Sequence, residues 1–392
     1  MLKLSDLEST GKKVLVRCDF NVPLKDGIIQ DDTRIVGALP TIKKLLDNRA
    51  AVILISHLGR PKGQVVPEMS LKPVADRLNE LLEAEVKFCE EAIGDKATKM
   101  ALELAAGEVL VLENLRFYAE EKNNDRKFAE SLASLADLFV QDAFGTIHRK
   151  HASMCGVPEI LVSAAGLLLE KEITFLGKAL VPEKPMALIL GGAKLETKIP
   201  IIENMLDKAD ILMIGGGMAF TLLKAKGSNI GKSLFDEDNF TRAVAIFQKA
   251  EDNNVTLFIP EDHVCASGLE DSEPVVINDN SIPDDLMGLD IGEKTSNLYK
   301  EKILHAKTIV INGPMGVFEN PAFSAGTRSV LEAIRESTEN GAVSIVGGGD
   351  TVSAITNLGF DKASFTHVST GGGASLKFLE GSELPGLKVL EK

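Results

Sequence analysis

Four glycine-rich turns follow apolar runs in the second half of the chain. They read LILGGAK at 188–194, LMIGGGMAF at 212–220, SIVGGGDTVSAI at 344–355 and HVSTGGGAS at 367–375. Glycine lets the backbone approach a ligand closely, and a turn from strand to helix directs free N–H groups and the positive end of the helix dipole toward one spot. Phosphate oxygens suit such a spot. Any one of these loops can be an ordinary turn, but four in one half favour phosphate binding.

Charged side chains accompany two of these turns. Lys194 and Lys198 follow the first loop four residues apart. On a helix they would share one face and place two positive charges over a polyphosphate, whereas the alternative is a pair of solvated surface lysines. Asp350 stands directly after three glycines. It is either a helix N-cap or a carboxylate that holds Mg²⁺ beside a phosphate site.

The first half of the chain instead ends its apolar runs with polar and cationic side chains. Eight of the eleven arginines lie within the first 149 residues. The residues at the run ends are Asp19, Asn21, His57, Arg60, Asn114, Arg116, Asp142, His148 and Arg149. The planar guanidinium binds carboxylate or phosphate at two points, so a group of arginines suits a small, multiply charged anion, although each alone reads as a surface ion-pair residue. The candidates for such a group are Arg34, Arg60, Arg116 and Arg149.

Other kinds of site fit these residues less well. GSNIGKS at 227–233 is one residue short of the P-loop spacing and follows a helical pattern, and no GxGxxG motif opens a helix after the first strand. The histidines in SHLGRP and HRKH favour anion contacts over metal, because ligand-spaced cysteines and carboxylates are lacking. A cationic site in one half and a nucleotide-like site in the other fit phosphoryl transfer, which needs positioning and charge neutralisation.

The elements that must position these residues are short strands alternating with helices. Apolar runs without alternation predict strands covered on both faces, in βαβ units of a parallel sheet. In the first half the runs are 13–23, 51–61, 109–117 and 137–149, and in the second half they are 186–194, 210–218, 256–264, 307–319, 343–350 and 366–374. Residues 164–181 read as a helix with Leu167, Leu168, Phe175 and Leu176 on one side. We therefore expect an α/β protein of two doubly wound parallel-sheet domains joined by a helix.

Composition agrees with two domains and restricts the partners. A chain of 392 residues with 44% hydrophobic residues can bury two cores. The net charge of −14 disfavours nucleic acid and anionic membranes. The apolar runs are too short to span a bilayer and MLKLSDLEST does not read as a signal peptide, so we expect a cytoplasmic protein without a membrane partner. The four cysteines lie far apart and predict neither a disulfide framework nor a zinc site.

The motifs taken together resemble the phosphoglycerate kinase family along the whole chain. They are RCDFNVP, SHLGRP, ENLRF, DAFGTIHR, GGAK, GGGM, NGPMGVFE, GGGDT and STGGGAS, in the family's order. The resemblance implies reversible phosphoryl transfer between ATP and the carboxylate of 3-phosphoglycerate, giving ADP and 1,3-bisphosphoglycerate in glycolysis. It also implies four segments: a phosphoglycerate domain at 1–165, a connecting helix at 166–181, a nucleotide domain at 182–375, and a C-terminal segment at 376–392 that packs back on the first domain.

Site residues follow from the resemblance, position by position. Phosphoglycerate would be bound by Asp19, Phe20, Asn21, Arg34, His57, Leu58, Gly59, Arg60, Arg116 and Arg149. The nucleotide would be bound by Gly191, Lys194, Lys198, Gly215, Asn312, Glu319, Gly348, Gly349, Asp350 and Thr351. Asp350 would hold Mg²⁺, and the catalytic groups around the migrating phosphoryl would be Arg34, Lys198 and the amides near Gly349 and Gly372.

One position departs from the family, and two other functions remain open. Ile311 stands where the family often has tryptophan, and the chain has no tryptophan at all, which puts local packing in doubt. Another carboxylate kinase would keep the nucleotide domain without the arginines of the first half. A non-catalytic nucleotide-binding protein would be favoured if Lys198, Arg34 or Asp350 were absent, and all three are present. We expect a monomer.

Overall fold

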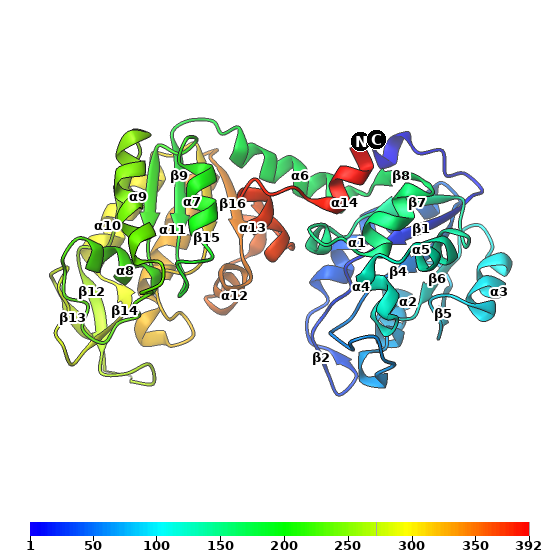
Figure 1. The fold of residues 1–392 in the computed structure, drawn as a ribbon, viewed down its shortest axis with the longest axis horizontal. Coiled ribbons are helices and arrows are strands. Elements are labelled where there is room, and N and C mark those ends of the chain that lie inside the picture. Colours follow the sequence, from blue (N-terminus) through cyan, green and yellow to red (C-terminus); the bar gives the residue numbers. More distant parts are fainter. Residues whose placement is uncertain (272, 392) are drawn as a thin grey trace. The chain divides into compact units, whose positions relative to one another are not determined.

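The computed structural model describes residues 1–271 and 273–391 and divides into two compact units. Unit 1 comprises Met1–Ile173 together with the segment from Glu383 onward, and unit 2 comprises Thr174–Ser382. The chain passes from one unit to the other within helix α6 (Leu167–Leu180) and again after Ser382. Each unit is built on its own parallel sheet, so the expected pair of α/β domains is confirmed (Figure 1).

Unit 1 holds a six-stranded parallel sheet in the order β5-β6-β4-β1-β7-β8. Its strands are β1 (Lys13–Arg17), β4 (Ala51–Ile55), β5 (Val86–Cys89), β6 (Val109–Leu112), β7 (Leu138–Gln141) and β8 (Val162–Ala165). Apolar side chains point alternately to two cores, since Val14 and Val16 face one and Leu15 faces the other. Both faces are therefore buried, as continuous apolar runs require.

Helices cover both faces of this sheet. On one face lie α1 (Thr33–Asp47) and α2 (Lys72–Leu81), which contribute Ile42 and Leu78 to the core. On the other face lie α3 (Asp95–Glu103), α5 (Arg126–Ala133) and the short α4 (Ala119–Asn123), with Phe128 and Leu132 of α5 buried. A small hairpin of β2 (Leu24–Lys25) and β3 (Ile28–Ile29) stands apart from the sheet.

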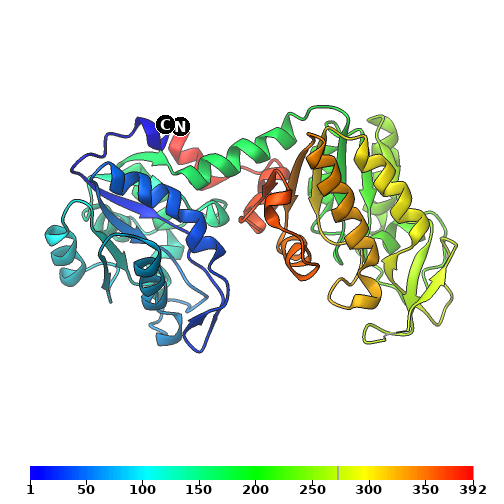
Figure 2. The same cartoon turned by 180° about the vertical axis from the view of Figure 1, so that it is seen from behind.

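Unit 2 repeats the architecture with the order β11-β10-β9-β15-β16-β17. These strands are β9 (Met186–Leu190), β10 (Ile211–Ile214), β11 (Thr256–Phe258), β15 (Thr308–Asn312), β16 (Val343–Gly347) and β17 (His367–Val368). Figure 1 shows α7 (Ile199–Met205), α8 (Met218–Ala225) and α9 (Phe240–Asp252) on one face, and Figure 2 shows α10 (Glu293–Leu304) and α11 (Ala325–Glu339) on the other. Ile311 is 1% exposed in the core beneath α10 and α11, so isoleucine packs well at this position.

A second sheet in unit 2 corrects one predicted strand. The run 256–264 is not a single strand, because β11 ends at Phe258 and β12 (His263–Ala266) belongs to an antiparallel sheet with β13 (Val275–Ile277) and β14 (Met287–Ile291). Pro260 lies between the two and lacks the N–H that a ladder needs. Sequence analysis did not predict β5, β8, β13 or β14.

The connecting helix begins later than predicted. Residues 162–165 form strand β8, and α6 starts at Leu167, where Asp142 Oδ1 accepts hydrogen bonds from the backbone N–H groups of Leu168 (3.0 Å) and Leu169 (3.2 Å). Leu169 and Leu176 are the fully buried leucines, whereas Leu168 and Phe175 are only partly buried. A carboxylate at the end of β7 therefore binds free N–H groups in the first turn of α6.

The end of the chain returns to unit 1, as expected. Gly386 in α14 (Pro385–Lys388) donates a backbone hydrogen bond to Ile147 (3.0 Å). This return begins at Glu383, later than the predicted residue 376, because α13 (Gly373–Leu379) packs in unit 2, where Asn204 Nδ2 donates to the Leu379 carbonyl (2.8 Å). No helix in the described part of the chain combines the length and apolarity of a membrane span.

Candidate functional site

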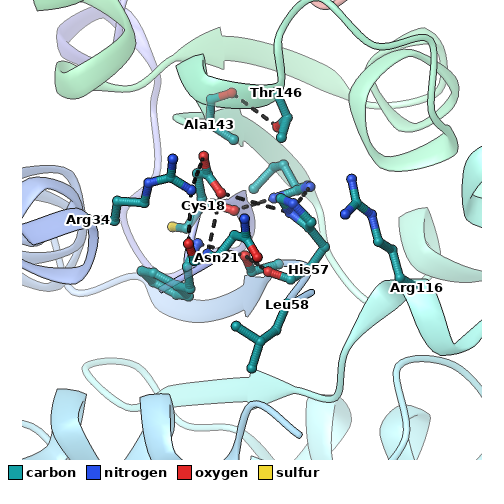
Figure 3. Close-up of polar contacts among 12 residues, drawn as sticks. Cys18, Asn21, Arg34, His57, Leu58, Arg116, Ala143 and Thr146 are labelled. Atoms are coloured by element: carbon teal, nitrogen blue, oxygen red, sulfur yellow. Dashed lines mark hydrogen bonds and ion pairs between the residues drawn. The ribbon is translucent and has the colours of Figure 1, made fainter. Parts of the chain in front are cut away.

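The carboxyl ends of the unit 1 strands bring the predicted anion-binding residues together. Asp19 and Asn21 follow β1, His57 follows β4, and Arg116 follows β6. Parallel strands end at one edge of the sheet, so residues far apart in sequence meet there. Figure 3 shows Asn21, Arg34, His57 and Arg116 at this edge.

Hydrogen bonds between these loops hold the edge in shape. Asn21 Oδ1 accepts from the Gly59 N–H (2.8 Å), and Asn114 Nδ2 donates to the Leu58 carbonyl (2.7 Å). Phe20 and Leu58 are buried, so their side chains serve packing and only their backbone can contact a ligand. Gly59 has φ +62°, a left-handed conformation that glycine adopts without strain, and a Cβ there would lie 2.7 Å from Met69 Sδ, so the loop favours glycine at this position.

A cationic pocket of about 350 Å³ opens at the same edge. Its described lining contains no carboxylate and consists of Arg60, Lys62, Arg116, Lys122, Arg149 and His151. Burial lowers the pKa of Arg149 from its ordinary value, Asp19 opposes this shift, and repulsion from Arg60 and Arg34 adds to it. Arg34 itself is 3.3 Å from the Asp19 carboxylate and donates to the Asn21 carbonyl (2.9 Å). Most of this positive charge has no ion-pair partner among the residues that the structure describes, which is the condition for binding a multiply charged anion.

Beneath this pocket lies a buried polar network that sequence analysis missed. Arg17, which is 0% exposed, donates from Nε to Ser153 Oγ (2.9 Å), and its NH2 group lies 3.2 Å from His57 Nδ1. Ser153 Oγ in turn donates to the Glu121 carboxylate (2.6 Å). Burial, reinforced by Arg17, puts the pKa of His57 well below its usual range, so His57 is neutral. An arginine inside the apolar run KVLVRC was the available signal, because a buried charge needs a partner.

In unit 2 the glycines fall into two classes. A Cβ at Gly191 would lie 2.1 Å from the Pro314 carbonyl oxygen, and one at Gly215 would lie 2.4 Å from Met315 Sδ. These glycines let neighbouring loops touch. A Cβ at Gly349 or Gly372, in contrast, would meet no described atom of a more distant residue within 4 Å, so these two glycines border open space. A ligand can therefore approach the backbone closely at Gly349 and Gly372.

The predicted helical pairing of Lys194 with Lys198 is wrong. Helix α7 begins at Ile199, Lys198 is its N-cap residue, and Lys194 lies exposed in the preceding loop. Pro200 near the start of the helix fits the first turn, where its missing N–H costs nothing. Lys198 is only 8% exposed, and its Nζ donates to Asn312 Oδ1 at the end of β15. Burial lowers its pKa to about 8, with Asp350 opposing the shift.

The start of α12 (Gly349–Asn357) places Asp350 beside this lysine. Gly348, with φ +87°, is the N-cap, so Asp350 is not the cap and its carboxylate is exposed. Thr351 is buried, and its hydroxyl donates to the Gly347 carbonyl (2.7 Å) and accepts from the Gly313 N–H (2.7 Å). The threonine side chain therefore fastens the loop, and what this turn offers a ligand is its backbone N–H groups and the Asp350 carboxylate.

A pocket of about 240 Å³ connects these loops with the antiparallel sheet. Its polar lining includes Gly192, Gly216, Gly217, Glu319 and Asp350, and its apolar lining includes Phe220, Leu234, Leu269, Met287 and Leu289. The apolar part of the lining suits a purine base, and the polar part suits a phosphorylated ribose. The described residues hold no group of three His, Cys, Asp or Glu side chains that could ligate a metal. A cation here would therefore need oxygen ligands from the nucleotide beside Asp350, as Mg²⁺ accepts in kinases.

Comparisons with known proteins relate the whole chain to one family. The sequence model of the phosphoglycerate kinase family matches residues 4–382. A phosphoglycerate kinase of Chloroherpeton thalassium is 52% identical over 390 residues, covering 99% of this chain and 98% of the relative. One from Clostridium novyi is 53% identical with the same coverage. The solved phosphoglycerate kinase of Coxiella burnetii superposes with a TM-score of 0.90 at 42% identity, covering 100% of this chain and 98% of that one.

Proposed function

The chain belongs to the phosphoglycerate kinase family, and we propose that unit 1 binds phosphoglycerate while unit 2 binds the magnesium nucleotide. The reaction is reversible phosphoryl transfer between ATP and the carboxylate of 3-phosphoglycerate, giving ADP and 1,3-bisphosphoglycerate. This activity belongs to glycolysis and makes the chain a transferase. The assignment of phosphoglycerate to unit 1 rests on the cationic pocket of that unit, whose described lining has no carboxylate.

Phosphoglycerate carries a phosphate and a carboxylate, which matches the guanidinium groups of unit 1. Arg60, Arg116 and Arg149 line the pocket and offer fork-shaped donors to the oxygens of both groups. Arg34 is held by Asp19 at the same edge of the sheet and would bind the transferred phosphoryl group. Asn21, His57 and Gly59 keep the loops in place, so the substrate meets a preorganised set of donors.

In unit 2 we assign the nucleotide to the pocket between the glycine loops and the antiparallel sheet. Glu319 is an exposed carboxylate in its lining and suits the ribose hydroxyls. Asp350 would hold Mg²⁺, which when bound offsets the negative charge of the phosphates. Lys198 and the backbone N–H groups near Gly349 and Gly372 would bind the phosphoryl oxygens.

The reaction needs no further catalytic group from the protein. A carboxylate nucleophile is ionised at neutral pH and needs no general base, so catalysis depends on positioning and charge neutralisation. The neutral His57 fits this, since it orients neighbours instead of moving a proton. Within the same proposal, the protein acts as a cytoplasmic monomer, and its net charge of −14 disfavours nucleic acid as a partner.

Two variants test whether unit 1 binds phosphoglycerate and unit 2 binds the nucleotide. Arg60→Met removes an exposed cation of unit 1, and we expect the KM for 3-phosphoglycerate to rise about tenfold while the KM for ATP stays unchanged. Asp350→Asn should raise the Mg²⁺ concentration needed for half-maximal rate and lower kcat, while the KM for 3-phosphoglycerate stays unchanged. Arg126→Met, at an exposed arginine paired with Glu130, is the matched control and should behave as the wild type.

A coupled assay of ATP-dependent phosphorylation of 3-phosphoglycerate provides all of these constants. The reverse pattern, in which Arg60→Met alters the nucleotide constants or Asp350→Asn alters those of phosphoglycerate, would contradict the division. Wild-type activity of Asp350→Asn at limiting Mg²⁺ would reject the metal assignment alone.

A further inference from the structure

The buried network beneath the cationic pocket of unit 1 ends at His57. Its members come from four segments: Arg17 ends β1, His57 follows β4, Glu121 lies in α4, and Ser153 lies in the helical segment Ala152–Gly156. All four side chains are at most 1% exposed. Polar side chains that are buried together fix one another's orientation when each finds a partner.

Glu121 fixes the direction of the Ser153 hydroxyl group. Its carboxylate accepts hydrogen bonds from the Ser153 N–H (3.0 Å) and from Ser153 Oγ (2.6 Å). A hydroxyl group has one proton, so Oγ can only accept from Arg17 Nε, which donates to it over 2.9 Å. Burial lowers the pKa of Arg17, and the Glu121 charge is the largest influence that opposes this shift. Glu121 therefore holds the guanidinium both through Ser153 and through its charge.

Arg17 in turn determines which nitrogen of His57 carries the proton. Its NH2 group lies 3.2 Å from His57 Nδ1, and a guanidinium can only donate. Nδ1 must then accept, so the proton of the neutral imidazole is on Nε2. The Asp19 carboxylate competes with Arg17, because its Oδ1 lies 3.8 Å from the same Nδ1 and would favour a proton there. The alignment of Arg17 decides between the two tautomers.

The other nitrogen of His57 is available to a ligand. Nε2 has no hydrogen-bond partner among the residues that the structure describes and is not completely covered by them. With its proton in place, Nε2 offers one N–H donor at the sheet edge that also holds Arg34 and Arg116 (Figure 3). With the proton on Nδ1, Nε2 would instead offer a lone pair, which repels the oxygens of an anion.

We propose that Glu121 is a positioning residue for phosphoglycerate binding, which acts through Ser153 and Arg17 to keep the proton of His57 on Nε2. His57 then donates from Nε2 to an oxygen of the substrate and adds a neutral donor to the cationic site. The inference rests on the proposed binding of phosphoglycerate to unit 1. It assigns a role to a fully buried carboxylate that does not touch the substrate.

The first test determines the tautomer of His57 in the wild-type protein. The ¹⁵N shifts of the histidine rings should show a protonated Nε2 and an unprotonated Nδ1 for His57, with its resonances assigned by their loss in His57→Gln. On titration with 3-phosphoglycerate, the Nε2 shift should change more than the Nδ1 shift. A proton on Nδ1, or an Nε2 shift that stays constant at saturating 3-phosphoglycerate, would overturn the inference.

The second test breaks the network at two points. Glu121→Gln removes the charge, and Ser153→Ala removes the hydroxyl link. In both variants we expect a mixture of His57 tautomers and a KM for 3-phosphoglycerate about tenfold higher, with kcat within about twofold of the wild type and the KM for ATP unchanged. Asp262→Asn is the matched control, because Asp262 is a buried carboxylate of unit 2 that likewise accepts from a backbone N–H and a hydroxyl group. It should leave the tautomer and the KM for 3-phosphoglycerate unchanged.

A raised KM with an unchanged tautomer would make the network a support for the loops alone and would overturn the inference. If neither variant folds, the measurement on the wild-type protein decides. Arg60→Met, measured alongside, separates this inference from the proposed function. If Arg60→Met raises the KM for 3-phosphoglycerate while folded Glu121→Gln and Ser153→Ala do not, the role of Glu121 fails and the substrate site stands. If none of the three raises it, the placement of phosphoglycerate in unit 1 fails.

Discussion

Lys198 shows how the position of one side chain sets its chemistry. It occupies the N-cap position of α7, is nearly buried, and donates from Nζ to Asn312 Oδ1. Desolvation makes its ammonium less stable than in water, which is why the pKa falls to about 8. A charge in so little water acts strongly on an approaching phosphoryl group.

Lys198→Ala should therefore lower kcat more than it raises the KM for ATP. If the ammonium stabilises the phosphoryl oxygens mainly in the transition state, its loss costs about 3 kcal/mol, or about a hundredfold in rate. Steady-state constants for both substrates, with the melting temperature as control, check this. Full kcat with a raised KM would make Lys198 a binding residue, and a large fall in melting temperature would make it structural.

The same lysine predicts a pH dependence. Its ammonium loses its proton as the pH rises through about 8, so kcat/KM for ATP in the wild type should fall above that pH. Lys198→Arg keeps its charge, and any activity it retains should lack this decline. A profile that is flat to pH 9 in the wild type would contradict the role of a charged Lys198.

At the scale of elements, the strand-to-helix turns of unit 2 separate glycines needed for packing from those that border open space. Gly191→Ala drives a methyl group to within 2.1 Å of the Pro314 carbonyl oxygen, and we expect it to destabilise unit 2 by about 1–3 kcal/mol. Gly349→Ala, at the start of α12, meets no described atom of a more distant residue within 4 Å and should leave the melting temperature nearly unchanged while activity falls, because the methyl group occupies the ligand's space. Calorimetry measures the stability of each variant, and the coupled assay measures its activity. An active Gly349→Ala enzyme would remove this turn from the site.

The start of α6 carries a pH-dependent contribution to stability. Burial raises the pKa of Asp142 from 3.8 to about 7, against hydrogen bonds from Thr41, Leu169 and Leu168. Between these pH values the folded state retains a proton that the unfolded state has lost, so this contribution is full at low pH and disappears as the pH rises through about 7.

Asp142→Asn should lack that decline. Its amide keeps an acceptor for the N–H groups of Leu168 and Leu169 and does not titrate. We expect the melting temperature of the variant to be similar to that of the wild type near pH 4 and to exceed it by a growing margin as the pH rises to about 7. Asp290 also has a pKa of about 7 and is present in both proteins, so its effect cancels in the comparison. Parallel pH profiles of the two proteins would contradict the role of Asp142.

At the scale of the whole molecule, the proposed sites lie on two units, each with its own sheet. Direct transfer requires reacting atoms about 3–3.5 Å apart and shielded from water. We therefore expect 3-phosphoglycerate and a non-hydrolysable ATP analogue together to reduce the radius of gyration measured by X-ray scattering, and either ligand alone to have a smaller effect. Asp350→Asn, with weaker magnesium binding, is the control. An unchanged radius in a catalytically competent protein would count against closure.

Much of the fold, and the gathering of the candidate site residues at one edge of the unit 1 sheet, could be predicted from the sequence. Apolar runs such as AVILI and VLVL have apolar side chains on both faces of the strand. They are therefore buried only in a sheet that is covered on both sides, as parallel sheets are. The polar residues after those runs then had to gather at one edge, since parallel strands end on the same side. These features depend on residues that are neighbours in the chain.

Tertiary structure decided which of these residues touch one another. Lys194 and Lys198 share no helix, and Gly191 packs against Pro314 while Gly349 borders open space. Arg17 reaches Ser153, which is 136 residues away in sequence. Burial, pKa and free space depend on atoms supplied by distant segments, so local spacing names the candidates and only the packed fold assigns their roles.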